Sequence, residues 1–136
     1  MTLKGVDVSY HQGHIDWKKV KNAGIQFAML RAGYGRNNID KQFHNNANGC
    51  RTNGIPFGVY WFSYAYTVEM ARQEARYCIA AIDQYEVQYP VCYDLEYDSI
   101  SYARKNGVII GKALATKMAV AFCEEVEKAG YKAMNY

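Results

Sequence analysis

The chain contains 136 residues, of which half are apolar and 21% are charged, and its formal net charge is +3. This length corresponds to one domain, and the composition provides enough apolar residues for a core. The small net charge argues against a nucleic-acid partner, and no apolar run approaches the roughly 20 residues of a membrane span. The 13 tyrosines hint at a carbohydrate partner without establishing one.

Predicted strands and helices alternate through the first half of the chain. Strands are expected at residues 4–9, 25–32 and 57–64, and helices at 16–23 and 40–53. Asp16 is the expected N-cap of the first helix, and Gly24 ends it. The second strand is almost continuously apolar, which is typical of a parallel strand covered on both faces.

The alternation continues through the second half. An amphipathic helix is expected over residues 67–85, a buried strand over 90–97, a helix over 112–129 and a fifth strand over 131–136. Residues 98–111 read as a long connection. This order predicts parallel strands joined by right-handed crossovers, in either a doubly wound open sheet or a β/α barrel. No glycine-rich phosphate motif follows the first strand, which argues against nucleotide binding.

Acidic residues at the ends of two strands favour the barrel, because catalytic groups gather at that rim of a β/α barrel. Five strand units in 136 residues is about 27 residues each, so eight units would need roughly 220. The sequence therefore predicts either a small open sheet or the N-terminal part of a longer β/α barrel domain.

The acids Asp94 and Glu96 stand at the end of the strand expected over residues 90–97. On a strand they would share a face about 6.6 Å apart, and one would hold its proton near neutral pH, giving a general acid beside an anionic neighbour. Two solvated acids at the end of an edge strand are an alternative. A magnesium or calcium site is a weaker one, because no His or Cys joins the pair. Asp7, at the end of the first strand, is expected on the same rim.

Aromatic residues accompany these acids. Tyr60, Phe62 and Tyr64 alternate onto one face of the third strand, and Tyr34 closes the second strand. Paired carboxylates beside rings that can stack on sugars suggest glycoside hydrolysis, although packing within the strand explains Phe62 equally well. Trp61 falls on the opposite face and is expected in the core.

The cysteines are expected to be buried free thiols, in preference to two disulfides, and their spacing matches no metal motif. Cys92 is in phase with Asp94, so we expect it deeper on the same inward face as a core residue. No serine or cysteine stands in a nucleophile elbow, which leaves nucleophilic catalysis by these residues without support. The four cysteines are Cys50, Cys78, Cys92 and Cys123.

Four segments together resemble the glycoside hydrolase family 25 lysozymes. The resemblance covers essentially the whole chain, in the right order. It is carried by Gly5–Ser9 with Gln12-Gly13 and Ile15–Trp17, by Phe27–Gly35, by Gly58–Ala65, and by Pro90–Glu96 with its Asp-x-Glu sequence. Trp61 departs from the family pattern, in which many members have histidine.

The resemblance implies an N-acetylmuramidase that cleaves the β-1,4 bond between N-acetylmuramic acid and N-acetylglucosamine in bacterial peptidoglycan. By carry-over, Glu96 is the general acid, Asp94 orients the substrate's acetamido group, and Asp7 shapes the site. Tyr60, Phe62, Tyr64 and Tyr34 are the candidate substrate-binding residues. No cofactor and no metal is expected. Retention of configuration, with participation of the acetamido group, is the preferred course.

The resemblance also implies a single β/α barrel domain over residues 1–136, truncated at its C-terminus. The first and last strands would then be open edges, able to pair with a second copy or a complementing fragment. The start of the chain has no signal-peptide pattern, which favours a phage endolysin released at lysis over an exported autolysin. A non-catalytic peptidoglycan-binding fragment and an unrelated open-sheet protein are the alternatives.

Overall fold

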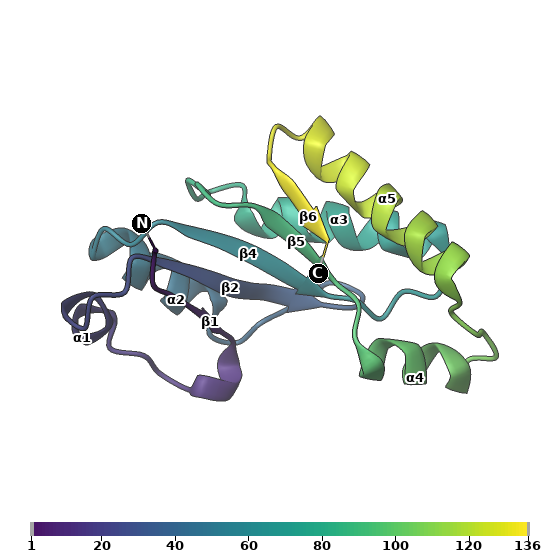
Figure 1. The fold of residues 1–136 in the computed structure, drawn as a ribbon, viewed down its shortest axis with the longest axis horizontal. Helices are drawn as coiled ribbons and strands as arrows, with labels where there is room; N and C mark the ends of the chain where they lie inside the picture. Colours follow the sequence, from purple (N-terminus) through teal and green to yellow (C-terminus); the bar gives the residue numbers. More distant parts are fainter. Residues whose placement is uncertain (1, 136) are drawn as a thin grey trace.

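The computed structural model describes residues 2–135, in which a sheet is covered by helices (Figure 1). The strands are β1 (Gly5–Val8), β2 (Phe27–Tyr34), β3 (Asn38–Ile39), β4 (Phe57–Phe62), β5 (Val91–Asp94) and β6 (Ala133–Asn135). The helices are α1 (Trp17–Asn22), α2 (Phe43–Thr52), α3 (Val68–Ile82), α4 (Tyr97–Lys105), α5 (Lys112–Lys128) and a short 3-10 helix, η1 (Tyr10–Gln12). No helix in this part of the chain is long and apolar enough to cross a membrane.

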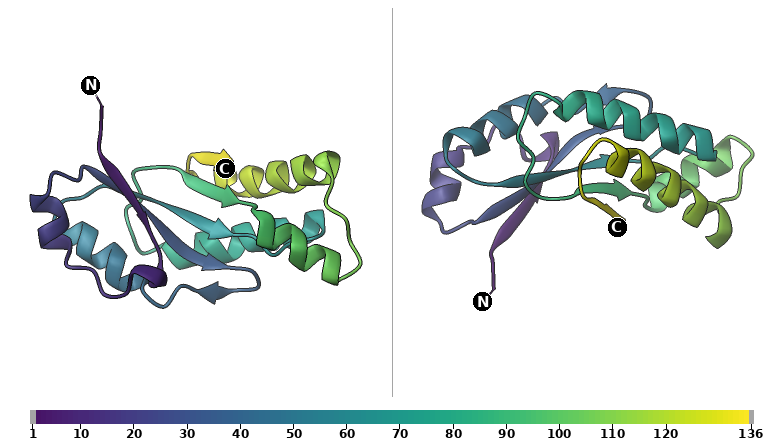
Figure 2. Two further views of the ribbon diagram at one scale, coloured as in Figure 1. Left: turned by 60° about the horizontal axis from the view of Figure 1, so that its bottom comes forward. Right: turned by 90° about the horizontal axis from the view of Figure 1, so that it is seen from above.

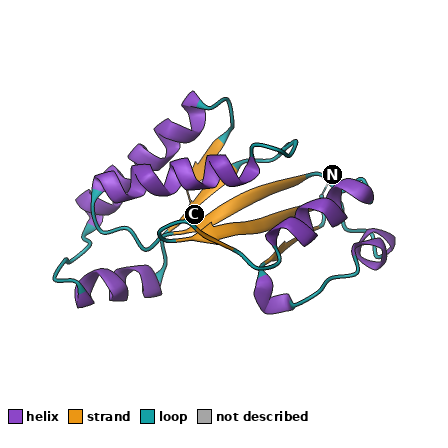
Figure 3. Ribbon diagram, turned by 180° about the vertical axis from the view of Figure 1, so that it is seen from behind, coloured by secondary structure: helices purple, strands orange, loops and turns teal. Residues whose placement is uncertain are grey.

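The strand order β1-β2-β4-β5-β6 follows the chain, and every pairing along this path is parallel. The short β3 pairs antiparallel with β2. Seen from behind, the helices lie in front of the strands, on one side of the sheet (Figure 3). A doubly wound sheet reverses its strand order at a switch point and carries helices on both faces. The observed order is that of a β/α barrel wall, so the barrel prediction is confirmed over the doubly wound alternative.

The barrel is not closed within residues 2–135. There, β1 pairs only with β2, and β6 pairs only with β5, so the sheet has two open edges. The views in Figure 2 show a twisted sheet in which the first strand, β1, and the last strand, β6, lie apart. The expected open edges are therefore present at the first and last strands.

The predicted helix starts are confirmed by their caps. Asp16 Oδ1 accepts a hydrogen bond from the Lys19 amide at 3.2 Å, and Thr67 Oγ1 accepts one from Met70 at 3.0 Å. Side-chain oxygens at this position satisfy amides that have no partner within the helix. Gly24, with a φ of 90°, follows α1 in the left-handed conformation that ends many helices.

The prediction for residues 90–111 is wrong in two respects. The strand ends at Asp94 rather than at residue 97, and the expected long connection contains helix α4. The Glu96 amide donates to Ser99 Oγ at 3.0 Å, a local bond that starts a helix and takes Glu96 off the strand. Ala103 is fully buried, so packing stabilises this helix, which its largely polar sequence does not indicate.

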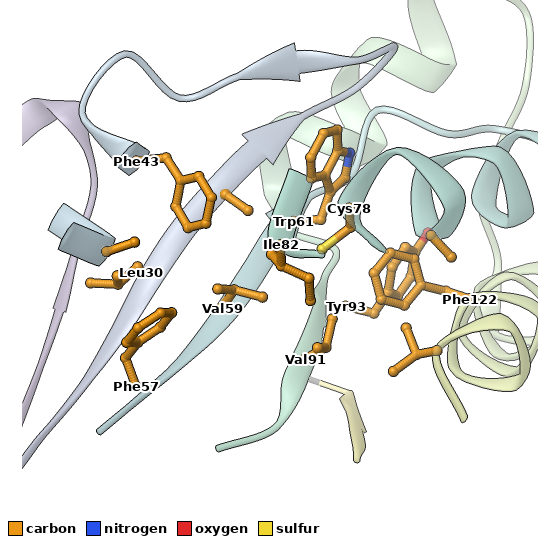
Figure 4. Close-up of a cluster of buried hydrophobic side chains, with 14 of the residues drawn as sticks. Leu30, Phe43, Phe57, Val59, Trp61, Cys78, Ile82, Val91, Tyr93 and Phe122 are labelled. Atoms are coloured by element: carbon orange, nitrogen blue, oxygen red, sulfur yellow. The ribbon is translucent and has the colours of Figure 1, made fainter. Parts of the chain in front are cut away.

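The core lies between the sheet and its helices (Figure 4). Trp61 is fully buried as predicted, and its Nε1 donates to the Gly35 carbonyl at 3.1 Å. Tyr93 packs against Phe122 of α5, with ring centroids 4.9 Å apart. All four cysteines are free thiols, as the sequence predicts, but Cys123 is only partly buried, whereas the other three are buried as expected.

Gly49 is required for the contact between α1 and α2. A Cβ atom there would overlap the Trp17 ring, which is held by a 3.1 Å hydrogen bond from Nε1 to Asn46. We expect Gly49→Ala to lower the free energy of unfolding by about 1–3 kcal/mol, because a buried ring must move. Lys18→Ala, at an exposed position of α1, is the control, expected within about 0.5 kcal/mol. Urea unfolding measures both, and equal effects would contradict the prediction.

Candidate active site

A cavity of about 310 Å³, here called the acid cavity, lies on the sheet face opposite the main helices. Alternation along β4 turns Val59 and Trp61 into the core and Tyr60 and Phe62 toward the cavity. The same alternation along β5 gives the cavity Cys92 and Asp94. Its lining residues are Asp7, Ser9, His11, Met29, Arg31, Tyr60, Phe62, Cys92, Asp94, Glu96 and Met134.

Asp94 is a buried carboxyl group at the end of β5. It is 4% exposed, and its Oδ1 has no hydrogen-bond partner. Burial raises the pKa of Asp94 well above its ordinary value, and the neighbouring carboxylates of Glu96 and Asp7 raise it further. The positive charge of Arg31 opposes these effects without cancelling them. Asp94 therefore holds a proton at pH values where an exposed aspartate has lost it.

Glu96 is exposed and caps the N-terminus of α4. The prediction that the two acids share one strand is wrong, because the strand ends at Asp94. Both acids nevertheless line the acid cavity. The start of a helix favours a negative charge, whereas burial disfavours one. The pair thus consists of a buried carboxyl that retains a proton and an exposed carboxyl at the opening of the same cavity.

Asp7, in the edge strand β1, lines the same cavity as Asp94 and Glu96, as predicted. It is exposed, on the face of β1 opposite the buried Val8. Tyr60 lies among the charged groups: burial raises the pKa of its hydroxyl, Asp7 and Asp94 raise it further, and Arg31 lowers it. Tyr60 is therefore a neutral hydrogen-bonding group between two of the acids.

The four predicted substrate-binding rings separate into two places. Tyr60 and Phe62 line the acid cavity, whereas Tyr34 and Tyr64 line an adjoining hollow of about 930 Å³. The Tyr64 ring lies 5.2 Å from Phe62 and 6.2 Å from Tyr34, between ring centroids, so the aromatic surface continues from one place to the other. Tyr66, Tyr77 and Tyr102 also line the hollow.

The ion pair between Arg31 and Asp40 is a part of the site that the sequence analysis missed. Arg31 Nε and Asp40 Oδ2 are 2.8 Å apart, and both side chains are buried. A single positive charge within an otherwise apolar strand was the signal for this pair. A buried charge requires a partner, and Asp40 was the acid nearest along the chain.

A second buried carboxyl, Glu74, holds α3 to the end of β4. Its oxygens accept hydrogen bonds from Ser63 Oγ at 2.7 Å and from the Tyr64 amide at 2.8 Å. Ser63 Oγ is also 2.9 Å from the Tyr93 hydroxyl. Burial raises the pKa of Glu74 to about 7, although these hydrogen bonds lower it. This network fixes the corner from which Tyr64 enters the hollow.

Nucleophilic catalysis by Cys92 has no support in this environment. As expected, Cys92 lies on the same inward face as Asp94, and burial raises the pKa of its thiol to about 12. The thiolate is the reactive form, and it is scarce at neutral pH. Within residues 2–135, His, Cys, Asp and Glu side chains form no group of three or more that could hold a metal ion.

A comparison with protein-family models identifies the family of the chain. The family model described as "Glycosyl hydrolases family 25" matches residues 6–136. The chain belongs to this family. The resemblance carried by the sequence segments is therefore confirmed.

Known proteins are similar to this chain in sequence or in fold. Lysozyme M1 of Streptomyces globisporus is 41% identical over 61 residues, which are 45% of this chain and 21% of that protein. The modular autolysin LytC of Streptococcus pneumoniae, solved in complex with a synthetic peptidoglycan ligand, is 27% identical with a TM-score of 0.85, over 98% of this chain and 32% of its own. A family 25 glycosyl hydrolase of Bacillus anthracis is 27% identical with a TM-score of 0.81. The match covers 99% of this chain and 60% of that protein. The chain thus spans less than two thirds of each relative.

Asp94 makes stability depend on pH. Because its pKa is raised in the folded state, the folded protein binds the proton more tightly than the unfolded chain does, and stability falls as pH rises from about 4 through neutral. Asp94→Asn removes this loss, so its stability relative to the parent should increase over the same range. One pKa unit corresponds to about 1.4 kcal/mol, and we expect at least that gain.

Urea unfolding at a series of pH values measures this difference. The exposed Asp83→Asn is the control for loss of an acid at the surface. A difference between Asp94→Asn and the parent that stays constant with pH would contradict a raised pKa for Asp94.

Proposed function

We propose that this chain forms the acid-bearing part of a peptidoglycan hydrolase that cleaves the β-1,4 bond between N-acetylmuramic acid and N-acetylglucosamine. The supporting observation is the pair in the acid cavity: the buried, proton-retaining Asp94 and the exposed Glu96, beside aromatic rings. Family membership and the peptidoglycan ligand bound to LytC agree with this substrate.

The two carboxyls have different roles in this proposal. Glu96, at the opening of the cavity, is the one that a polymer can reach, and it protonates the leaving oxygen as general acid. Asp94, at the floor, orients the acetamido group, and its unpaired Oδ1 is available for this contact. Burial raises the pKa of Asp94 and favours its neutral form in the free protein. Catalysis requires a proton on Glu96 when the bond breaks.

The remaining predicted residues act on binding. Asp7 supplies a further negative charge, which stabilises positive charge that develops on the sugar. Tyr60 and Phe62 contact the sugar at the scissile bond. Tyr34 and Tyr64, in the adjoining hollow, contact a more distant part of the polymer. Such aromatic faces suit sugar rings because they are apolar and wide.

Replacement of the exposed acid tests this function. We expect Glu96→Gln to lower the rate of reducing-sugar release from purified peptidoglycan by about 10²–10⁴-fold, because the amide has no proton to transfer. Glu124→Gln, at an exposed position of α5, is the matched control and should keep the parent's rate. A Glu96→Gln variant as active as the parent would contradict the proposal.

A non-catalytic peptidoglycan-binding role is the second candidate, because the sheet that carries the cavity is not closed within residues 2–135. In that case the parent chain co-sediments with peptidoglycan but releases no reducing ends.

The anomer of the released product tests the preferred course of the catalytic reaction. Retention is expected when the acetamido group participates, and inversion would exclude participation.

We further propose that residues 1–136 belong to a single catalytic domain acting at the bacterial cell wall, in an endolysin or autolysin.

The open edges of β1 and β6 can accept a strand from a second copy or from a complementing fragment, because their outer backbone groups have no partner in the described part of the sheet. We expect self-association that increases with concentration, measured by sedimentation equilibrium. A single-chain mass at all concentrations would exclude pairing between copies.

A further inference from the structure

Arg31 is fixed at the wall of the acid cavity by contacts on several sides. It stands in the middle of β2, and the residue is 9% exposed. Its Nε donates to Asp40 Oδ2, and its guanidinium lies 5.1 Å from the Tyr10 ring centre and 4.9 Å from that of Tyr34. A planar cation between two rings and a carboxylate keeps one orientation.

The partner that holds Arg31 is itself held. Asp40 Oδ2 also accepts a hydrogen bond from the Tyr10 amide at 3.1 Å, and Oδ1 accepts one from the Gln42 amide at 2.9 Å. The carboxylate is therefore anchored at both oxygens by backbone groups of two segments. Arg31 consequently keeps its position without a ligand, which reduces the ordering cost of binding one.

The guanidinium has more donors than this environment satisfies. A guanidinium carries five N–H groups, and in residues 2–135 the bond to Asp40 is its only hydrogen bond. Nη2 is buried and has no partner. An unsatisfied buried donor is costly, and Arg31 lines the acid cavity. An acceptor atom of a bound molecule would remove this cost.

The charges around the cavity indicate the kind of acceptor. Asp40 already compensates the charge of Arg31, and the other ionisable acids lining the cavity are Asp7, Asp94 and Glu96. A carboxylate ligand would meet repulsion from Asp7 and Glu96, whereas Asp94 favours its neutral form. A neutral carbonyl oxygen accepts the same N–H groups without that repulsion.

We propose that Arg31 is a specificity-determining residue, whose guanidinium donates a hydrogen bond to the carbonyl oxygen of a sugar's acetamido group in the acid cavity. This inference rests on the proposed function, since it assumes an N-acetylated glycan. It assigns the recognition of the amide to Arg31 in addition to Asp94. A site that holds an amide in this way disfavours a sugar with a hydroxyl at the same carbon. A hydroxyl oxygen is bonded directly to the ring and does not reach as far as the amide carbonyl, so the buried donor stays unpaired.

Binding of two neutral oligosaccharides tests the inference without requiring turnover. Chitotetraose carries acetamido groups, and cellotetraose carries hydroxyls in their place. Measured by titration calorimetry, the parent chain should prefer chitotetraose by about 10- to 100-fold. In Arg31→Lys, which keeps the charge but loses the fork of donors, this preference should fall at least about tenfold. Arg104→Lys, exposed on α4, is the control.

A measurement on the parent protein covers the case in which Arg31→Lys does not fold. The guanidinium NMR signals of Arg31 should shift with chitotetraose and stay unchanged with cellotetraose. An unchanged preference in a folded Arg31→Lys, or unchanged Arg31 signals, would overturn this inference alone. No binding of chitotetraose by the parent would overturn the inference together with the proposed function. If the protein binds a muramyl oligosaccharide more tightly than chitotetraose, and Arg31→Lys abolishes this preference, Arg31 binds the lactyl carboxylate. That result would also overturn the inference.

Discussion

The alternation of side chains along parallel strands is the constraint on which the rest of the molecule depends. Each of the central strands β4 and β5 must turn one row of side chains toward the helices and the other toward the opposite face. On the helix side this row is apolar and fully buried, as Val59, Trp61 and Val91 are. On the other side the same strands present Tyr60 and Asp94. The core and the acid cavity are therefore two faces of one register, and a slip of one residue would destroy both.

Burial of Asp94 and exposure of Glu96 turn two similar side chains into different chemical groups. Only one residue separates them, yet the strand ends between them and a helix begins. Proximity alone would make the two acids compete for a proton in a symmetrical way. The change of element breaks that symmetry, since the low-polarity surroundings of Asp94 favour its neutral form. The geometry of the chain thus favours the neutral form of Asp94 before any substrate arrives.

Much of this could be predicted from the sequence because the deciding signals are local. The hydrophobic period, Asp16 as an N-cap, and the phase of Cys92 with Asp94 correctly predicted the main helices, the buried face and the inward position of the acid. Helix α4 was missed because its residues are largely polar, and its stability comes from Ala103 and neighbours packed from elsewhere in the fold. The prediction that Tyr64 shares a strand face with Tyr60 and Phe62 is wrong for a related reason. β4 ends at Phe62, so the alternation no longer applies beyond it, and Tyr64 lines the adjoining hollow.

The position of Glu96 on α4 has a consequence for how the protein responds to heat. Asp94 belongs to a central strand paired on both sides, whereas Glu96 is held by the first turn of a nine-residue helix. Helix ends open at a smaller free-energy cost than central strands do. Fraying of that first turn would carry one acid away while the other stays in place. The arrangement of the two acids would then be lost with a single helical turn, while the sheet is still folded.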